Sequence, residues 1–172
     1  MAINSADLAA RVAAAVPSSG AECFVTPGDG AIEIAAAAVV DVVRFLRDDP
    51  DLALRLFLDV TAVDYQDSRG QIELIYVLRS MVSGERVLVK TRVDAAAPRV
   101  ATISHLFAGA NWAEREVYDM FGVHFEGHPN MRRILLYEEF QGHPLRKSYP
   151  YQKRQPLTPE RDPIADPWPK KR

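Results

Sequence analysis

Apolar residues recur at the spacing of one helix face in two segments of the chain, 5–16 and 36–47. The residues that make this pattern are Leu8, Val12 and Val16 in the first segment and Val39, Val42, Val43 and Leu46 in the second. This spacing predicts two amphipathic helices. Pro17 and Pro50 follow the two segments, and proline ends a helix because it has no amide hydrogen to donate.

Apolar and polar residues alternate in five other segments, the pattern of strands with one buried face. Two short segments, 22–26 and 31–35, flank Pro27-Gly28-Asp29-Gly30, which predicts a hairpin turn. The expected inward rows of the longer strands are Leu54, Leu56, Leu58 and Val60, then Ile72, Leu74, Tyr76 and Leu78, then Val87, Val89, Thr91 and Val93. The order is αββαβββ, so we expect an α+β domain of two layers, with the helices on one face of a mixed sheet.

Two further helices are predicted, a short one over 101–108 and a longer one over 111–121. In the longer helix we expect Asn111 to be the N-cap, with Glu114 as its capping-box partner. Gly122 stands where a C-terminal glycine cap belongs.

The same helix has charged residues at helical spacing. Arg115 and Asp119 are four residues apart and are expected to pair. The expected buried stripe is Ala113, Val117, Met120 and Phe121. After Gly122 the periodicity fades, and residues 133–140 predict either one strand or one helical turn.

Charge divides the chain near residue 127. Residues 1–127 hold 11 Lys and Arg against 18 Asp and Glu, a balance of −7, whereas residues 128–172 hold 10 against 5, a balance of +5. Eight of the 12 prolines also lie in 128–172. We therefore expect a folded domain over 1–122 and an extended, basic, proline-rich arm over 123–172 that contacts partner proteins.

Few residues of the chain suggest catalysis or metal binding. Its one cysteine, Cys23, lies in a predicted strand, and we expect a buried, unreactive thiol there. Glu114 and Glu116 point about 200° apart on a helix, so they cannot share a substrate. The four histidines do not have the spacing of a metal site, and no nucleophile motif or phosphate-binding loop is present. We therefore expect no catalytic, cofactor-binding or metal-binding residue.

Neither a signal peptide nor a membrane span is expected. The N-terminal segment has an acid at Asp7 and no basic region ahead of an apolar stretch. The longest apolar run, 35–40, is far too short to span a bilayer.

Arginine and aromatic residues gather between 111 and 150, beside two Gly-His-Pro turns. These are the residue types of interface centres. Our candidates for contacts with a partner protein are Trp112, Glu114, Arg115, Glu116, Tyr118, Asp119, His128, Arg132, Arg133, His143, Arg146 and Lys147. A basic-tailed nucleic-acid-binding protein and a standalone enzyme are the alternatives, and the acidic body argues against nucleic acid.

Four motifs resemble one known family. They are E-R-E-V-Y-D-M-F-G at 114–122, G-H-P-x-x-R-R-I-L at 127–135, G-H-P-L-R-K at 142–147 and D-V-T-A-V-D-Y at 59–65. Together they resemble the 30 kDa subunit of respiratory complex I, which is the C subunit of bacterial NADH-quinone oxidoreductase. Two pairs depart from it: Asn130-Met131 stands where the family usually has Asp-Leu, and Ser148-Tyr149 where it usually has Asp-Phe.

The resemblance implies the αββαβββ fold and a subunit of the hydrophilic arm that has no cofactor. FMN, iron–sulfur clusters and quinone are then expected on partner subunits, especially the large quinone-site subunit and its iron–sulfur neighbours. The complex passes electrons from NADH to quinone and translocates protons. The implied location is peripheral, on the cytoplasmic side of the bacterial inner membrane. An equivalent subunit of a ferredoxin- or hydrogenase-linked relative is a further alternative.

Overall fold

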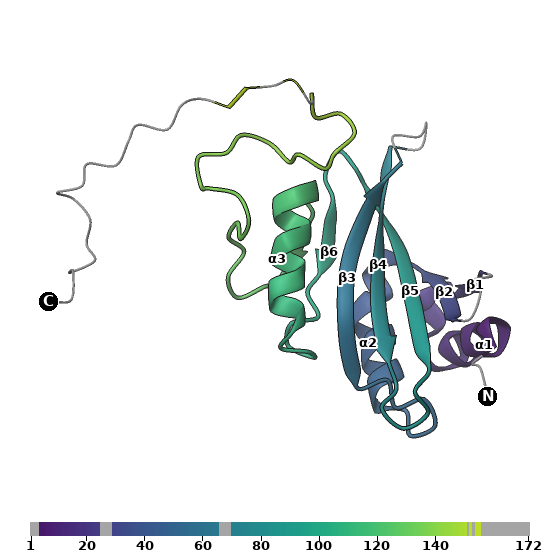
Figure 1. The fold of residues 1–172 in the computed structure, drawn as a ribbon. Helices are drawn as coiled ribbons and strands as arrows, with labels where there is room; N and C mark the ends of the chain where they lie inside the picture. Colours follow the sequence, from purple (N-terminus) through teal and green to yellow (C-terminus); the bar gives the residue numbers. More distant parts are fainter. Residues whose placement is uncertain (1–3, 25–28, 66–69, 151, 153, 156–172) are drawn as a thin grey trace, which may run out of the picture.

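A five-stranded mixed sheet forms the centre of the fold (Figure 1). The computed structural model describes residues 4–24, 29–65, 70–150, 152, 154 and 155. The strands are β1 (Glu22–Cys23), β2 (Gly30–Ile34), β3 (Leu56–Asp64), β4 (Gln71–Arg79) and β5 (Arg86–Asp94), in the spatial order β1-β2-β5-β4-β3. β3, β4 and β5 form an antiparallel meander, and β2 joins β5 in parallel. The predicted αββαβββ order and mixed sheet are confirmed; Pro27 and Gly28 lie outside the described residues.

Two helices cover one face of this sheet, α1 (Ser5–Ala15) and α2 (Val39–Asp48) (Figure 1). The side chain of Asn4 caps α1 by accepting a hydrogen bond from the amide of Ala6. The predicted apolar face of α2 is confirmed, since all four of its residues are fully buried. The preceding residues Ala36–Ala38 form a 3-10 turn rather than the first turn of the α-helix.

The inward rows of β4 and β5 are those that alternation predicts. The buried residues are Ile72, Leu74, Tyr76 and Leu78 on β4 and Val87, Val89, Thr91 and Val93 on β5. In the row predicted for β3, Leu54 and Val60 are buried as expected and Leu56 is half-buried, but the prediction fails at Leu58, where a bulge between Phe57 and Asp59 shifts the register. Leu58 is therefore 43% exposed, while Phe57 packs against the ring of Phe107.

The opposite face of the sheet is charged. Arg92 pairs with Glu33 at 3.0 Å and with Glu73 at 3.6 Å, and Lys90 lies 3.3 Å from Glu73. Cys23, at the edge of the sheet, is exposed, so the expectation of a buried thiol is wrong. Among the described residues, the two-residue strand β1 pairs only with β2, so no neighbouring strand covers its other side.

A second unit follows the sheet. β6 (Arg99–Ala101) pairs in parallel with β7 (His124–Glu126), and α3 (Ala110–Phe121), which lies between them in the sequence, packs against β3. The predicted short helix over 101–108 is wrong. Its start is strand β6, and its remainder forms turns, because the amide of Thr102 continues the pairing with Glu126.

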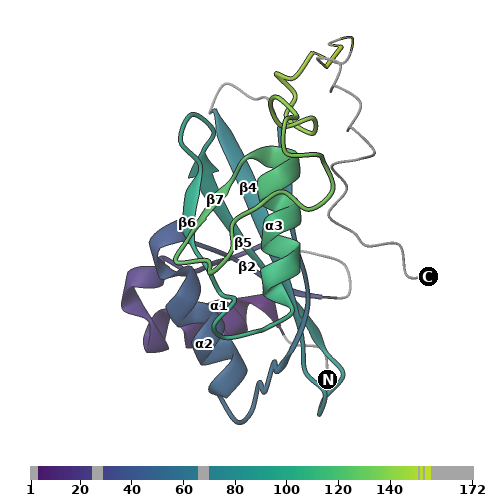
Figure 2. The same ribbon diagram turned by 90° about the vertical axis from the view of Figure 1, so that its left-hand side faces the viewer.

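The core continues past the predicted end of the domain at residue 122. Val123 is fully buried and Phe125 is 1% exposed, and both belong to the same apolar cluster as the sheet. Residues 133–140 form neither a strand nor a helical turn. After β7 the chain turns near the start of α3 and runs back along that helix to its C-terminal end (Figure 2). We call residues 128–150 the strap.

Phe125→Ala should destabilise the chain by about 3–5 kcal/mol, because it leaves a cavity in the shared core. The matched control is His124→Ala on the same strand, where the side chain is exposed and the change should stay within about 0.5 kcal/mol. Urea unfolding of both purified variants measures the difference. Equal stability of the two variants would contradict a core that extends to Phe125.

Candidate partner interface

The first turn of α3 is not capped as predicted. Gly109 is the N-cap, and no side chain in the described part of the chain caps this turn. The side chain of Asn111 therefore stays available, while its carbonyl oxygen receives a bond from the ring of His128. The capping-box prediction for Glu114 is wrong because that carboxyl points into the protein.

Glu114 is fully buried between α3 and the chain that follows β6. One carboxyl oxygen accepts the amide of Ile103 at 2.8 Å, and the other lies 2.5 Å from the hydroxyl of Thr102. Burial raises the pKa of Glu114 to about 7, although these two bonds oppose the shift. Glu114 is therefore part of the fold, and its side chain is not on the surface that a partner would contact.

His128, from the first Gly-His-Pro turn, is the neighbour of Glu114. Its side chain is buried, with Nε2 3.9 Å from the Glu114 carboxyl. Nδ1 accepts the amide of Asn130, so Nε2 carries the hydrogen that is donated to Asn111. Burial lowers the pKa of His128, in keeping with this neutral form. The ring thus packs inside the chain and caps a turn.

Asp119 joins α3 to the strap. Its buried carboxylate accepts Arg133 Nη1 at 2.7 Å. The other oxygen accepts three successive amides, those of Ile134, Leu135 and Leu136, at 3.1, 2.9 and 2.9 Å. Burial acts to raise the pKa of this carboxyl, but the amides and Arg133 outweigh it and lower the pKa below its usual value. These bonds also explain why 134–136 form no regular element.

The predicted pair between Arg115 and Asp119 is wrong, because both side chains bond to the strap instead. Arg115 donates to the carbonyl oxygens of Arg132 and Arg133 at 3.0 and 3.1 Å. Its guanidinium carbon also lies 5.2 Å from the centre of the Trp112 ring. Arg115 therefore connects the exposed tryptophan to the strap.

The far end of the strap lies over the C-terminal end of α3. Gly122 has φ +75°, which confirms the predicted glycine cap, and a side chain there would come within 2.6 Å of the His143 ring. His143 Nδ1 lies 2.9 Å from the carbonyl oxygen of Asp119. Arg146 donates to the carbonyl oxygens of Phe121 and Ala95 at 2.5 and 3.1 Å.

The candidates for partner contact therefore divide into three groups. Buried within the chain are Glu114 and Asp119. Arg115, His128, Arg133, His143 and Arg146 bond to backbone groups of the same chain, and Tyr118 is half-buried with its ring edge-on to His143. Exposed are Trp112, Glu116, Arg132 and Lys147.

The strap also exposes apolar side chains that charge patterns do not reveal. Leu135 is 61% exposed and Leu145 51%, and Tyr137 is exposed beside Phe140. The signal in the sequence is the presence of apolar residues in an aperiodic, basic segment. They make the outer side of the strap part apolar and part charged, with Arg132 and Lys147 exposed as well as Glu138 and Glu139.

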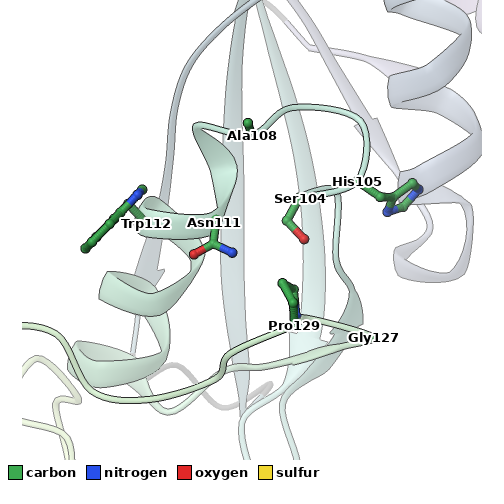
Figure 3. Close-up of a pocket in the computed structure, with 7 residues that line it drawn as sticks. All are labelled: Ser104, His105, Ala108, Asn111, Trp112, Gly127 and Pro129. Carbon is green, nitrogen blue, oxygen red and sulfur yellow. The ribbon is translucent and has the colours of Figure 1, made fainter.

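A groove opens beside the start of α3, with a volume of about 560 Å³ (Figure 3). We call it the Trp112 groove. It is lined by Ser104, His105, Ala108, Asn111, Trp112, Gly127 and Pro129. Only Trp112 of these is among the predicted site residues, because the groove joins segments that are distant in sequence.

The described residues contain neither a metal site nor a membrane span. No group of three or more His, Cys, Asp and Glu side chains there is arranged to hold a metal ion. No helix in these ranges has both the length and the apolar character to cross a membrane.

Sequence comparison relates the chain to one group of proteins. Residues 32–155 match the family described as respiratory-chain NADH dehydrogenase, 30 kDa subunit. The C subunit of NADH-quinone oxidoreductase from Roseiflexus sp. (strain RS-1) is 39% identical over 150 residues, which cover 87% of this chain and 86% of that protein. The corresponding protein of Xanthobacter autotrophicus is 42% identical over 144 residues, covering 84% and 68%.

Two solved structures are similar in fold. A chain of the membrane-bound sulfane sulfur reductase, an archaeal respiratory membrane complex, has a TM-score of 0.69 and 26% identity, and the match covers 91% of this chain and 96% of that one. The trypsin-resistant fragment of Nqo5 has a TM-score of 0.55 and 27% identity, covering 72% and 98%.

Asp119→Asn should destabilise the folded chain by about 3–5 kcal/mol, because it leaves Arg133 without its buried anion and turns an amide donor towards other donors. Asp59→Asn, at an exposed acid of β3, is the control and should have little effect. Urea unfolding measures both. A loss below about 1 kcal/mol would show that the carboxylate does not hold the strap.

The stability of the isolated chain should fall as pH rises through 7. The folded Glu114 carboxyl has a pKa of about 7 against an ordinary value of 4.5, so the folded state retains a proton that the unfolded chain releases. This contribution is complete below pH 4.5 and is lost as pH rises through about 7, with a slope of up to about 1.4 kcal/mol per pH unit.

Glu114→Gln should flatten this slope, because the amide does not titrate but can still accept the Ile103 bond. Urea unfolding at a series of pH values measures it, with Glu116→Gln as the control that retains the slope. His128 and His143 act oppositely: burial lowers their pKa values, so their contribution is present above 6.5 and lost as pH falls. An unchanged slope in Glu114→Gln would exclude the carboxyl as its source.

Proposed function

This chain belongs to the family of the 30 kDa subunit of respiratory-chain NADH dehydrogenase, and we propose that it is a non-catalytic subunit of the hydrophilic arm of an NADH:quinone oxidoreductase. In this role it supports assembly and thereby electron transfer from NADH to quinone, coupled to proton translocation. The identity of about 40% to relatives that are named as subunits of NADH-quinone oxidoreductase supports the complex.

The strap is the observation that carries the assembly role. Its polar side chains and amides are bonded to α3, so its conformation is set before any partner binds. Its outer side presents Leu135, Tyr137 and Leu145 together with exposed charges of both signs, Arg132, Glu138 and Glu139. Aromatic, apolar and arginine side chains on a preformed backbone are the features of interface centres, because little entropy is lost on binding.

We place FMN, the iron–sulfur clusters and quinone on partner subunits. The large quinone-site subunit and its iron–sulfur neighbours are the proposed partners of the strap and of the remaining arm up to residue 172. The chain would then reach the cytoplasmic face of the bacterial inner membrane only through the complex. The polar groups around α3 bond mainly to groups of the same chain, which supports placing the cofactors on partner subunits.

An equivalent subunit in a complex with another electron donor is the second candidate. The similarity to a chain of the membrane-bound sulfane sulfur reductase favours it, with a TM-score of 0.69. NADH oxidation by the purified assembly distinguishes the two, since only the first complex consumes NADH.

Leu135→Asp should lower the amount of chain recovered in the large assembly by about tenfold, because it places a charge in an apolar contact. The Leu135 amide still bonds to Asp119, so the melting temperature of the free chain should stay unchanged. Membranes carrying a tagged copy are extracted in mild detergent and resolved on native gels with mass spectrometry.

Leu58→Asp is the control, since Leu58 is exposed on β3 rather than on the strap. Equal recovery of both variants would show that the outer side of the strap is not an interface. A wild-type chain found only as a free monomer, with a tag shown not to block assembly, would remove the subunit role itself.

A further inference from the structure

Two hydroxyl groups connect the buried Glu114 carboxyl to the Trp112 groove. The carboxyl oxygen that does not accept the Ile103 amide lies 2.5 Å from the Thr102 hydroxyl, which lies 2.8 Å from the Ser104 hydroxyl. Thr102 is buried, whereas Ser104 is half-buried and lines the groove (Figure 3). The three groups therefore form a path from the core of the chain to an open surface.

The Thr102 hydroxyl has only one hydrogen to donate along this path. A threonine hydroxyl donates once and accepts twice, and one of its acceptor positions takes the Ser104 amide at 3.1 Å. It therefore donates either to Glu114 or to the Ser104 hydroxyl, and its remaining acceptor position serves the other group. The carboxyl decides between the two, because an ionised carboxylate only accepts whereas a protonated carboxyl has a hydrogen to donate.

The two protonation states of Glu114 give the Ser104 hydroxyl opposite orientations. When the carboxyl is ionised, Thr102 donates to it and Ser104 donates to Thr102, so Ser104 offers only lone pairs to the groove. When the carboxyl is protonated, its hydrogen lies on the oxygen that faces Thr102, because the other oxygen accepts the Ile103 amide. Thr102 then donates to Ser104, and the hydrogen of the Ser104 hydroxyl can point into the groove.

The titratable groups around Glu114 do not change charge together with it. In the described chain, His128 of the strap and Tyr76 of β4 face this carboxyl from other elements. Burial, aided by the charge of Arg115, lowers the pKa of His128, and burial raises the pKa of Tyr76. Both are therefore mainly neutral near pH 7, where the Glu114 carboxyl changes its charge.

We propose that Glu114 controls, through Thr102, whether Ser104 donates or accepts hydrogen bonds in the Trp112 groove. With the proton bound, Ser104 donates to a carbonyl or carboxylate oxygen of a ligand. With the proton released, it accepts an N–H or O–H group instead. Binding of a ligand oxygen at Ser104 is therefore linked to proton uptake, and binding of a ligand donor is linked to proton release. This proposal is independent of the proposed function, because it concerns groups of this chain alone.

NMR titration of the purified full chain tests the coupling. The carbon-13 signals of the Glu114 carboxyl and of Ser104 Cβ should both move, with a midpoint at about pH 7. In Glu114→Gln the amide donates to Thr102 at every pH, so the Ser104 signal should stay at its low-pH wild-type position. Glu116→Gln, at an exposed acid of the same helix, is the control and should retain the wild-type titration.

Three outcomes of this titration would overturn the proposal. They are a wild-type Ser104 signal that does not move while Glu114 titrates, a Ser104 signal that still moves in Glu114→Gln, and one that stays there at the high-pH position.

Thr102→Val distinguishes the hydroxyl path from the electric field of the carboxylate. Valine has the shape of threonine without its hydroxyl, so Glu114 should still titrate, with its pKa raised further because the Thr102 bond that lowers it is lost. The Ser104 signal should lose its titration in this variant, whereas Thr102→Ser, which keeps the hydroxyl, should retain it. A Ser104 signal that follows Glu114 equally in both variants would show that the field alone couples them, and the proposal would fail.

Discussion

The buried carboxylate of Asp119 is the interaction on which the C-terminal half of the structure depends. A charge that is removed from water must be matched by donors nearby, or the folded state loses several kcal/mol. Here one guanidinium and three successive amides supply them, all from the strap. The same guanidinium, on Arg133, also donates to the carbonyl oxygen of Gly142. The strap therefore runs along α3 because the buried Asp119 carboxylate needs hydrogen-bond donors, and the strap supplies them.

The parts of the fold that follow from simple periodicity are predictable from the sequence. The apolar face of α2 and the inward rows of β4 and β5 have the expected residues because each packs on one layer only. Alternation does not predict the exposure of Leu58 in β3. A bulge adds one residue to the strand there, and no sequence pattern marks where a bulge occurs. The pairing of β6 with β7 is not predictable in this way, because three residues are too few for a periodic signal.

The candidate site shows a different kind of failure. Sequence patterns treat charged residues as solvated, so they place Glu114 and Asp119 on the surface. Both are instead fully buried, because their carboxyl oxygens accept hydrogen bonds from amides that come from outside the helix. The inverse holds for Leu135 and Leu145, which are apolar yet exposed. Sequence reasoning thus finds this region of the chain and the exposure of Trp112 and Arg132, but it misplaces the two acids of α3 and the apolar residues of the strap.

The Asp119 bonds also impose an order on folding during synthesis. The carboxylate emerges from the ribosome before its amide donors, which lie 15 to 17 residues later in the chain. Until those residues are available, α3 cannot bury its C-terminal half without leaving an unsatisfied charge. The meander of β3, β4 and β5 has no such requirement, because its hydrogen bonds join strands that are consecutive in the chain. During translation, therefore, the sheet can form first, and α3 can pack fully beside it only after residues 134–136 have been synthesised.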